Sequence, residues 1–173
     1  MAGLDPLPQS QYHISDWITW TGPVLPDSSE RLMMADDDDY RGILNAIAAY
    51  SHAVDRGDWS IIHRAYDDQT QHVNADDVTV LGVDAFIEYR KHRETFQGKD
   101  VLHIPYNLLV DIDGDSATCL SNWTYLVKAP AVDRWDISAV GVYDDTFRRT
   151  DQGWRFATRK IHNFAKVDPR TWT

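Results

Sequence analysis

The spacing of apolar residues changes abruptly near Gly98, and this change restricts the chain to folds that combine helices with an antiparallel sheet. Before it, apolar side chains recur every three or four residues, as in amphipathic helices. After it, apolar and polar residues alternate, which is the period of a strand with one buried face. We therefore predict an α+β fold in which helices cover one face of a curved antiparallel sheet.

Three helices are predicted before Gly98. The first begins at the aspartates of residues 36–39, whose charge stabilises a helix N-terminus, and ends at Gly57. A short second helix follows with Asp58 as its N-cap, and a third covers residues 83–96. Between the last two, residues 71–82 are expected to form two short strands. The first helix buries a single apolar stripe, formed by Ile43, Ile47, Tyr50 and Val54.

Four long strands are predicted after Gly98. Alternating runs at 100–112 and 116–128 flank an Asp-Gly-Asp turn, which predicts a β-hairpin. Two further runs, at 135–150 and 153–167, flank an Asp-Gln-Gly turn. Together with the three helices, these strands complete the predicted α+β architecture.

The first long strand has apolar residues at every even position from 102 to 112, which predicts a continuous core face. His103 and Asn107 then lie on the opposite face. Two arrangements stay open. In the first, a bulge or edge at Pro105 changes which residues of the strand face the core. In the second, the odd-numbered face lines a cavity while the even-numbered face packs in a dimer interface.

Size and charge limit the domain count and the partners. The chain has 173 residues, which suits one domain over residues 36–173, preceded by an arm or lid at 1–35. Its 27 acidic and 17 basic residues give a net charge of −10, which disfavours nucleic acid and membranes as partners. No secretory signal or membrane-spanning apolar run is present, so we expect a cytoplasmic protein.

Several familiar site types are missing from the sequence. It contains no phosphate-binding loop, nucleophile elbow or HExxH zinc motif, and Cys119 is the only cysteine. We therefore expect neither a cofactor nor a metal, although a metal site built from scattered histidines stays open.

Asp55 and His103 are the strongest candidates for chemistry. Asp55 lies at the C-terminal end of the first helix, where the helix dipole disfavours a carboxylate. If the sheet curls around the helices, Asp55 can meet His103, accept its imidazole N–H and fix its tautomer. The other nitrogen can then remove a proton from a substrate. The alternative is that His103 is an ordinary, partly buried histidine.

The segments "ILNAIAAYSHAVDRGDW", "LHIPYNLLVDIDGDSATCLSNW" and "GVYDDTFRRTDQGWRFATRKI" resemble the superfamily of ketosteroid isomerase, scytalone dehydratase and the SnoaL-like polyketide cyclases. The resemblance covers roughly residues 38–165. It implies a cone-shaped α+β barrel with three N-terminal helices packed on a curved mixed or antiparallel sheet.

Within the SnoaL-like branch, the motifs are most similar to those of hexachlorocyclohexane dehydrochlorinase. Its catalytic Asp follows a valine, as Asp55 does, and its catalytic His begins a His-x-x-x-Asn pattern, as His103 does. The resemblance therefore implies an Asp55–His103 dyad with His103 as general base. The first helix lacks that enzyme's lysine, and Arg148 and Arg149 fall near its arginine without aligning. Another elimination or an isomerisation is therefore expected.

Further candidates follow from side-chain type. Tyr50 and Asn107 are expected to polarise a substrate oxygen. The side chains expected to shape the pocket are Trp59, Tyr66, Trp123, Tyr125, Tyr143 and His162. For Tyr50 and the other aromatic candidates, plain core packing is the open alternative.

The expected function is that of a cofactor-independent dehydratase, isomerase or cyclase, which is a lyase or an isomerase. Its substrate is expected to be small, largely apolar, and cyclic or polyketide-like, and the chain is expected to form a homo-dimer or homo-trimer. Three alternatives stay open: an epoxide hydrolase on the same fold, a non-catalytic ligand-binding protein, and a subunit like the small subunit of ring-hydroxylating dioxygenases.

Overall fold

A computed structural model describes residues 37–97, 100–129 and 133–166 of the chain. The arm or lid expected at residues 1–35 lies outside these ranges and stays a prediction. Within the described residues, none of the helices is long and apolar enough to cross a bilayer.

The three predicted helices are present. Helix α1 spans Asp37–Arg56 and stops where Gly57 takes a left-handed backbone angle, φ 63°. Helix α2 spans Trp59–Ile62, and its N-cap Asp58 accepts a hydrogen bond of 3.2 Å from the backbone N–H of Ser60. Helix α3 spans Val83–Gln97.

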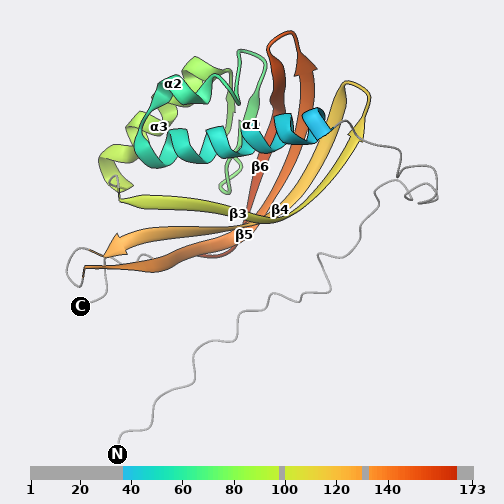
Figure 1. The fold of residues 1–173 in the computed structure, drawn as a ribbon. Helices are drawn as coiled ribbons and strands as arrows, with labels where there is room; N and C mark the ends of the chain where they lie inside the picture. Colours follow the sequence, from blue (N-terminus) through green and yellow to red (C-terminus); the bar gives the residue numbers. More distant parts are fainter. Residues whose placement is uncertain (1–36, 98–99, 130–132, 167–173) are drawn as a thin grey trace, which may run out of the picture. The chain divides into compact units, whose positions relative to one another are not determined.

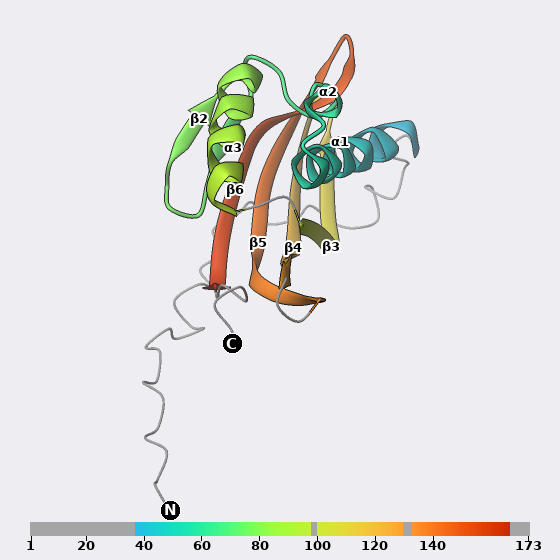
Figure 2. The same ribbon diagram turned by 90° about the vertical axis from the view of Figure 1, so that its left-hand side faces the viewer.

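Within the described ranges, six strands form one sheet, in the spatial order β2-β1-β6-β5-β4-β3. All neighbours are antiparallel except β1 and β6, which are parallel, so the sheet is mixed. The sheet curves around the helices, which all lie on its concave face (Figures 1 and 2). The strands are β1 (Gln71–Val73), β2 (Thr79–Leu81), β3 (Val101–Asp113), β4 (Ser116–Ala129), β5 (Arg134–Thr150) and β6 (Gly153–Lys166).

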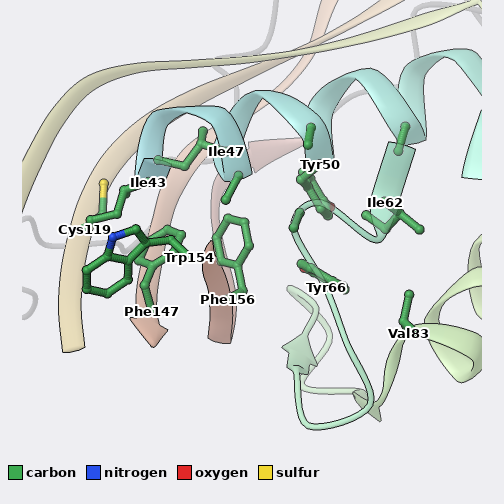
Figure 3. Close-up of a cluster of buried hydrophobic side chains, with 14 of the residues drawn as sticks. Ile43, Ile47, Tyr50, Ile62, Tyr66, Val83, Cys119, Phe147, Trp154 and Phe156 are labelled. Carbon is green, nitrogen blue, oxygen red and sulfur yellow. The ribbon is translucent and has the colours of Figure 1, made fainter. Parts of the chain in front are cut away.

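The main core fills the space between α1 and the sheet. Figure 3 shows Ile43, Ile47 and Tyr50 projecting from α1 towards Phe147 and Phe156 of the sheet. These five side chains are at most 3% exposed. The apolar stripe predicted for the first helix is therefore its buried face, and it fixes α1 across the sheet.

A bulge in β3 divides the strand into two halves that face opposite ways. The β3–β4 register shifts between Tyr106 and Leu109, and Asn107 takes a left-handed φ of 54°. Before the bulge, odd-numbered residues such as His103 face the interior; after it, even-numbered residues such as Val110 do. The predicted continuous even face is therefore wrong: Leu102, Ile104 and Tyr106 are exposed on the outer side.

Three further register shifts occur among the described strands. One lies between β4 and β5 at Tyr125, and two lie between β5 and β6, at Gly141 and between Thr146 and Phe147. A Cβ atom on Gly141 would lie 1.8 Å from the carbonyl oxygen of His162, so only glycine fits this close approach. The bends curve the long strands around a cavity beside α1 and α3.

Candidate active site

Asp55 and His103 are hydrogen-bonded to each other. The end of α1 brings Asp55 to the start of β3, where its Oδ1 atom lies 2.6 Å from Nδ1 of His103. The same carboxylate accepts the backbone N–H of His103 at 3.0 and 3.1 Å. These contacts fix both the position of the carboxylate and the orientation of the imidazole ring.

The pair is held in one protonation pattern by its surroundings. The side chains of His103 and Asp55 are 9% and 8% exposed. Burial lowers the pKa of His103 from its ordinary 6.5, although the hydrogen bond to Asp55 opposes this shift, so the imidazole is neutral at pH 7. Because a carboxylate anion only accepts hydrogen bonds, we assign the proton of the neutral ring to Nδ1, which leaves a lone pair on Nε2.

His103 lines a cavity between α3, the β1–β2 hairpin and the bent strands β4–β6. The open space inside it is about 90 Å³. This is small beside the roughly 300–1,000 Å³ typical of ligand pockets. The wall combines aromatic rings with cationic and amide groups: Tyr50, His72, Asn74, Tyr89, Arg90, Arg93, Trp123, Tyr125, Tyr143 and Asn163.

A fully buried ion pair supports the aromatic wall of this cavity. Arg159 on β6 donates two hydrogen bonds to Asp145 on β5, of 2.9 and 2.7 Å, and neither side chain is exposed. The guanidinium carbon lies 4.2 Å from the ring centre of Tyr50 and 4.1 Å from that of Tyr143. Burial opposes the charge of Arg159, but Asp145 outweighs it and raises the pKa of the guanidinium, so the pair is ionised.

A second histidine lies in the cavity wall. His72 on β1 is 2% exposed, and its Nδ1 atom lies 2.9 Å from the hydroxyl of Tyr66. Burial lowers the pKa of His72 well below 6.5, with nearby Arg159 and Arg90 adding to the effect, so this ring is also neutral. His72 therefore offers the cavity a neutral hydrogen-bonding group.

The structure gathers some of the predicted residues around His103 and leaves others outside. Tyr50, Trp123, Tyr125 and Tyr143 line the cavity with it. Tyr50 packs edge-on to the imidazole at 6.2 Å, and burial raises the pKa of its hydroxyl, which stays protonated.

Four predicted site residues do not line the cavity. Asn107 is exposed at the β3 bulge, because the bulge itself turns its side chain away from the interior. Trp59 and Tyr66 pack in or against the main core instead. His162 lies on β6 between two lining residues and, since side chains alternate along a strand, belongs to the other face.

The two arginines considered near the last hairpin serve other contacts. Arg148 pairs with Asp67, and Arg149 pairs with Asp39 and Asp115. Arginines that the sequence pattern does not single out occupy the site region instead: Arg90 and Arg93 of α3 line the cavity, and Arg159 supports its wall.

Cys119 is a packed core residue. Burial raises the pKa of its thiol to about 12, so the thiol is protonated at neutral pH. Among the residues that the structure describes, no three His, Cys, Asp or Glu side chains cluster as metal ligands would.

Comparisons with known proteins agree with this fold. Residues 37–160 match the family described as the SnoaL-like domain. A search of curated proteins found no match.

Solved structures share the architecture at low sequence identity. A protein of unknown function from Mycobacterium tuberculosis is 22% identical, with a TM-score of 0.67 over 80% of this chain and 84% of that one. A hexachlorocyclohexane dehydrochlorinase from Novosphingobium barchaimii is 14% identical, with a TM-score of 0.65 over 74% of this chain and 88% of that one. A candidate scytalone dehydratase from Novosphingobium aromaticivorans is 20% identical, with a TM-score of 0.63 over 75% and 86%. The likeness to these structures is one of fold, whereas the family match spans more than half of the sequence, and the chain therefore belongs to the SnoaL-like domain family.

Proposed function

We propose that this protein is a cofactor-independent enzyme of the dehydratase or isomerase type, in which Asp55 and His103 form the catalytic dyad. The observation that carries the proposal is the 2.6 Å hydrogen bond between them at the wall of the cavity. The structurally similar dehydrochlorinase and candidate scytalone dehydratase support a lyase reaction on this fold.

Proton transfer begins at Nε2 of His103, the nitrogen that Asp55 does not contact. The neutral imidazole removes a proton from a carbon that a neighbouring carbonyl makes acidic. In a dehydration, the C–H electron pair forms a C=C double bond while the C–O bond to a hydroxyl breaks. The imidazolium returns its proton to the departing hydroxide, which leaves as water. In an isomerisation, the same proton returns to a different carbon.

Asp55 is assigned a charge-stabilising and orienting role. Its carboxylate contacts Nδ1 of the ring that becomes cationic when Nε2 takes the proton, at a site with little exposure to water. Positioned acid–base groups of this kind contribute roughly 10²–10⁴-fold to a rate. We assign the hydrogen bonds to the developing oxyanion to Tyr50 and the neutral His72, because both line the same cavity.

Deuterium exchange tests the proposal without knowledge of the natural substrate. The protein is incubated in D₂O with a panel of small ketones and hydroxy ketones, and loss of the C–H signal is followed by proton NMR. We expect exchange with the wild type, and no exchange above background with His103→Gln or Asp55→Asn. His52→Gln, at an exposed position of α1, is the matched control. Unchanged exchange in both dyad variants, with folding intact, would refute the proposal.

The epoxide hydrolase alternative receives less support from the side chains. That chemistry needs an arginine between two cavity aspartates. In the described part of the chain, Arg159 pairs with Asp145, whereas Asp55 is hydrogen-bonded to His103.

We also infer that copies of the chain associate through the outer side of the sheet. An apolar set lies there, each member at least 39% exposed, and is called here the outer apolar face: Leu102, Ile104, Tyr106, Leu109, Leu120 and Ile137. Such clusters mark association surfaces in soluble proteins, which supports a homo-dimer or homo-trimer.

A further inference from the structure

Arg90 is a buried cation whose charge nothing in the described structure balances. Arg90 is 9% exposed and lines the cavity, and its Nε atom has no hydrogen-bond partner. None of the ion pairs formed by the described residues includes Arg90. A buried charge is costly unless it is paired, so a position of this kind calls for an anionic partner.

Arg159 is a useful comparison, because it is a buried arginine with a structural partner. Arg159 is fully buried too, and its Nη1 atom also lacks a hydrogen-bond partner, but Asp145 balances its charge through two hydrogen bonds and aromatic rings surround it. Arg90 has no such carboxylate among the described residues. The charge of Arg159 is therefore balanced within the fold, whereas the charge of Arg90 is left for a ligand in the cavity to balance.

The cavity as a whole has more hydrogen-bond donors than acceptors. The indole Nε1 of Trp123 is buried and also lacks a partner among the described residues. Arg93 lines the cavity as well, and it donates to the hydroxyl of Tyr89 at 3.0 Å. The one carboxylate among the lining residues that the structure describes is Asp76, which is exposed in the β1–β2 loop. A ligand that fits this lining must supply acceptor atoms and negative charge.

We propose that the substrate is a small oxo acid, whose carboxylate binds Arg90 while its keto group activates the carbon that faces His103. This inference rests on the dyad proposed above and names its substrate class. It replaces the largely apolar substrate expected from the sequence with an anionic one.

A carboxylate suits the site better than a larger anion. The guanidinium fork binds a planar carboxylate through two parallel hydrogen bonds, and the open space of about 90 Å³ leaves room for a small molecule. The keto group is needed as well, because an ionised carboxylate makes its neighbouring C–H bond a poor acid, whereas a ketone makes it a better one. The carboxylate therefore anchors the substrate to Arg90, and the keto group activates the C–H bond.

Anion binding would also change the basicity of the dyad. The positive charge of Arg90 contributes to lowering the pKa of His103, after the larger effect of burial. A carboxylate on Arg90 offsets that charge, so binding raises the pKa of His103 and makes it a stronger base when substrate is present.

Binding of 4-oxopentanoate and of its neutral amide, 4-oxopentanamide, tests the proposal. Isothermal titration should give roughly tenfold or tighter binding of the carboxylate over the amide in the wild type. The preference should disappear in Arg90→Met and shrink in Arg90→Lys, which keeps the charge and loses the fork. Arg64→Met, at an exposed position outside the cavity, is the control and should keep the full preference. Equal affinity for acid and amide, or an unchanged preference in Arg90→Met, would overturn the proposal, as would tighter binding of inorganic phosphate than of the acid.

Deuterium exchange on the same two compounds separates this inference from the proposed function. If the acid binds through Arg90 but its C–H bonds do not exchange, the dyad proposal fails and the anion site stands. If acid and amide exchange equally well in the wild type, and Arg90→Met changes neither, the dyad stands and the anion site fails.

Thermal denaturation without ligand gives an independent readout. Because Arg90 is a buried charge without a counter-ion among the described residues, Arg90→Met should raise the Tm of the ligand-free protein. The acid should raise the Tm of the wild type and leave that of Arg90→Met unchanged. A lower Tm for ligand-free Arg90→Met than for the wild type would mean that Arg90 serves the fold, and would contradict the proposal.

Discussion

Replacing Asp145 by asparagine should destabilise the protein strongly while changing few atoms. The amide introduced by Asp145→Asn can still accept one hydrogen bond from Arg159, but its NH₂ group then faces the second guanidinium N–H, donor against donor. The negative charge is lost as well, in a site where both side chains are fully buried. Removing one partner of a buried ion pair typically costs about 3–5 kcal/mol. We expect a loss in that range, because both of the original hydrogen bonds are short and charge-assisted.

Urea denaturation followed by circular dichroism measures this loss. The midpoint should fall while the m-value stays the same, which would show that the native and unfolded states keep their exposed areas. Glu88→Gln is the matched control, because its pair with Lys91 is exposed on α3. An exposed pair contributes about 0.2–1 kcal/mol.

A double variant gives the reasoning a second test. Asp145→Leu together with Arg159→Met removes both charges, and it should recover much of the stability lost in Asp145→Asn because no charge is left unpaired. A loss in Asp145→Asn as small as that in Glu88→Gln would refute the argument that the buried pair holds the β5–β6 wall.

Three further results follow from the same structure. Because burial lowers the pKa of His103 below 6.5, kcat/KM should be flat at neutral pH and should decline only on the acid side of 6.5, where the base becomes protonated; a decline that begins above pH 7.5 would contradict this. The unfolded chain takes up a proton on His72 near the ordinary pKa of 6.5, whereas the folded protein does so only at much lower pH. The free energy of unfolding should therefore fall as the pH drops below 6.5. Denaturation curves of His72→Gln at several pH values should show a smaller dependence on pH. Ile104→Glu, on the outer apolar face, should convert an oligomer to a monomer in size exclusion with light scattering, whereas a monomeric wild type would exclude association through that face.

Local signals account for the part of the fold that the sequence predicts well. Helix α1 ends at Gly57, and the turn of the β3–β4 hairpin contains Gly114. Both glycines adopt positive φ angles. The apolar period distinguishes helix from strand, and Asp58 caps α2 as its position indicates. These features depend on neighbouring residues, so they can be recognised without knowledge of the tertiary structure.

The bulges are where sequence and structure disagree. The sequence indicates an irregularity in the first long strand only at Pro105. The register shift between β3 and β4 instead lies beyond Tyr106, where Asn107 adopts the left-handed conformation that asparagine tolerates. Counting back from the Thr150–Gly153 pair in a regular hairpin would set Asp145 opposite Thr158. The register shift between Thr146 and Phe147 moves Asp145 opposite Arg159, and so aligns the two side chains of the buried ion pair.

The cationic residues of the site could not be recognised from local pattern. Arg90 and Arg93 occur in a stretch of α3 rich in charged residues, which is typical of a solvent-exposed helix face. They line a cavity because the bent sheet passes beside α3, a long-range feature without a local signature. Asp55 and His103 can be found because Asp55 conflicts with the dipole of its own helix and because both match motifs of the family.

Nitrogen-15 NMR of the histidine side chains tests the central claim most directly. At neutral pH, in the ligand-free protein, the account predicts that His103 is neutral with its proton on Nδ1, and that its Nε2 is unprotonated. In Asp55→Asn the carboxylate is gone, and the Nε2–H tautomer should become populated. Finding the wild-type His103 with a proton on Nε2, or as an imidazolium at pH 7, would contradict the assignment of this residue as the base.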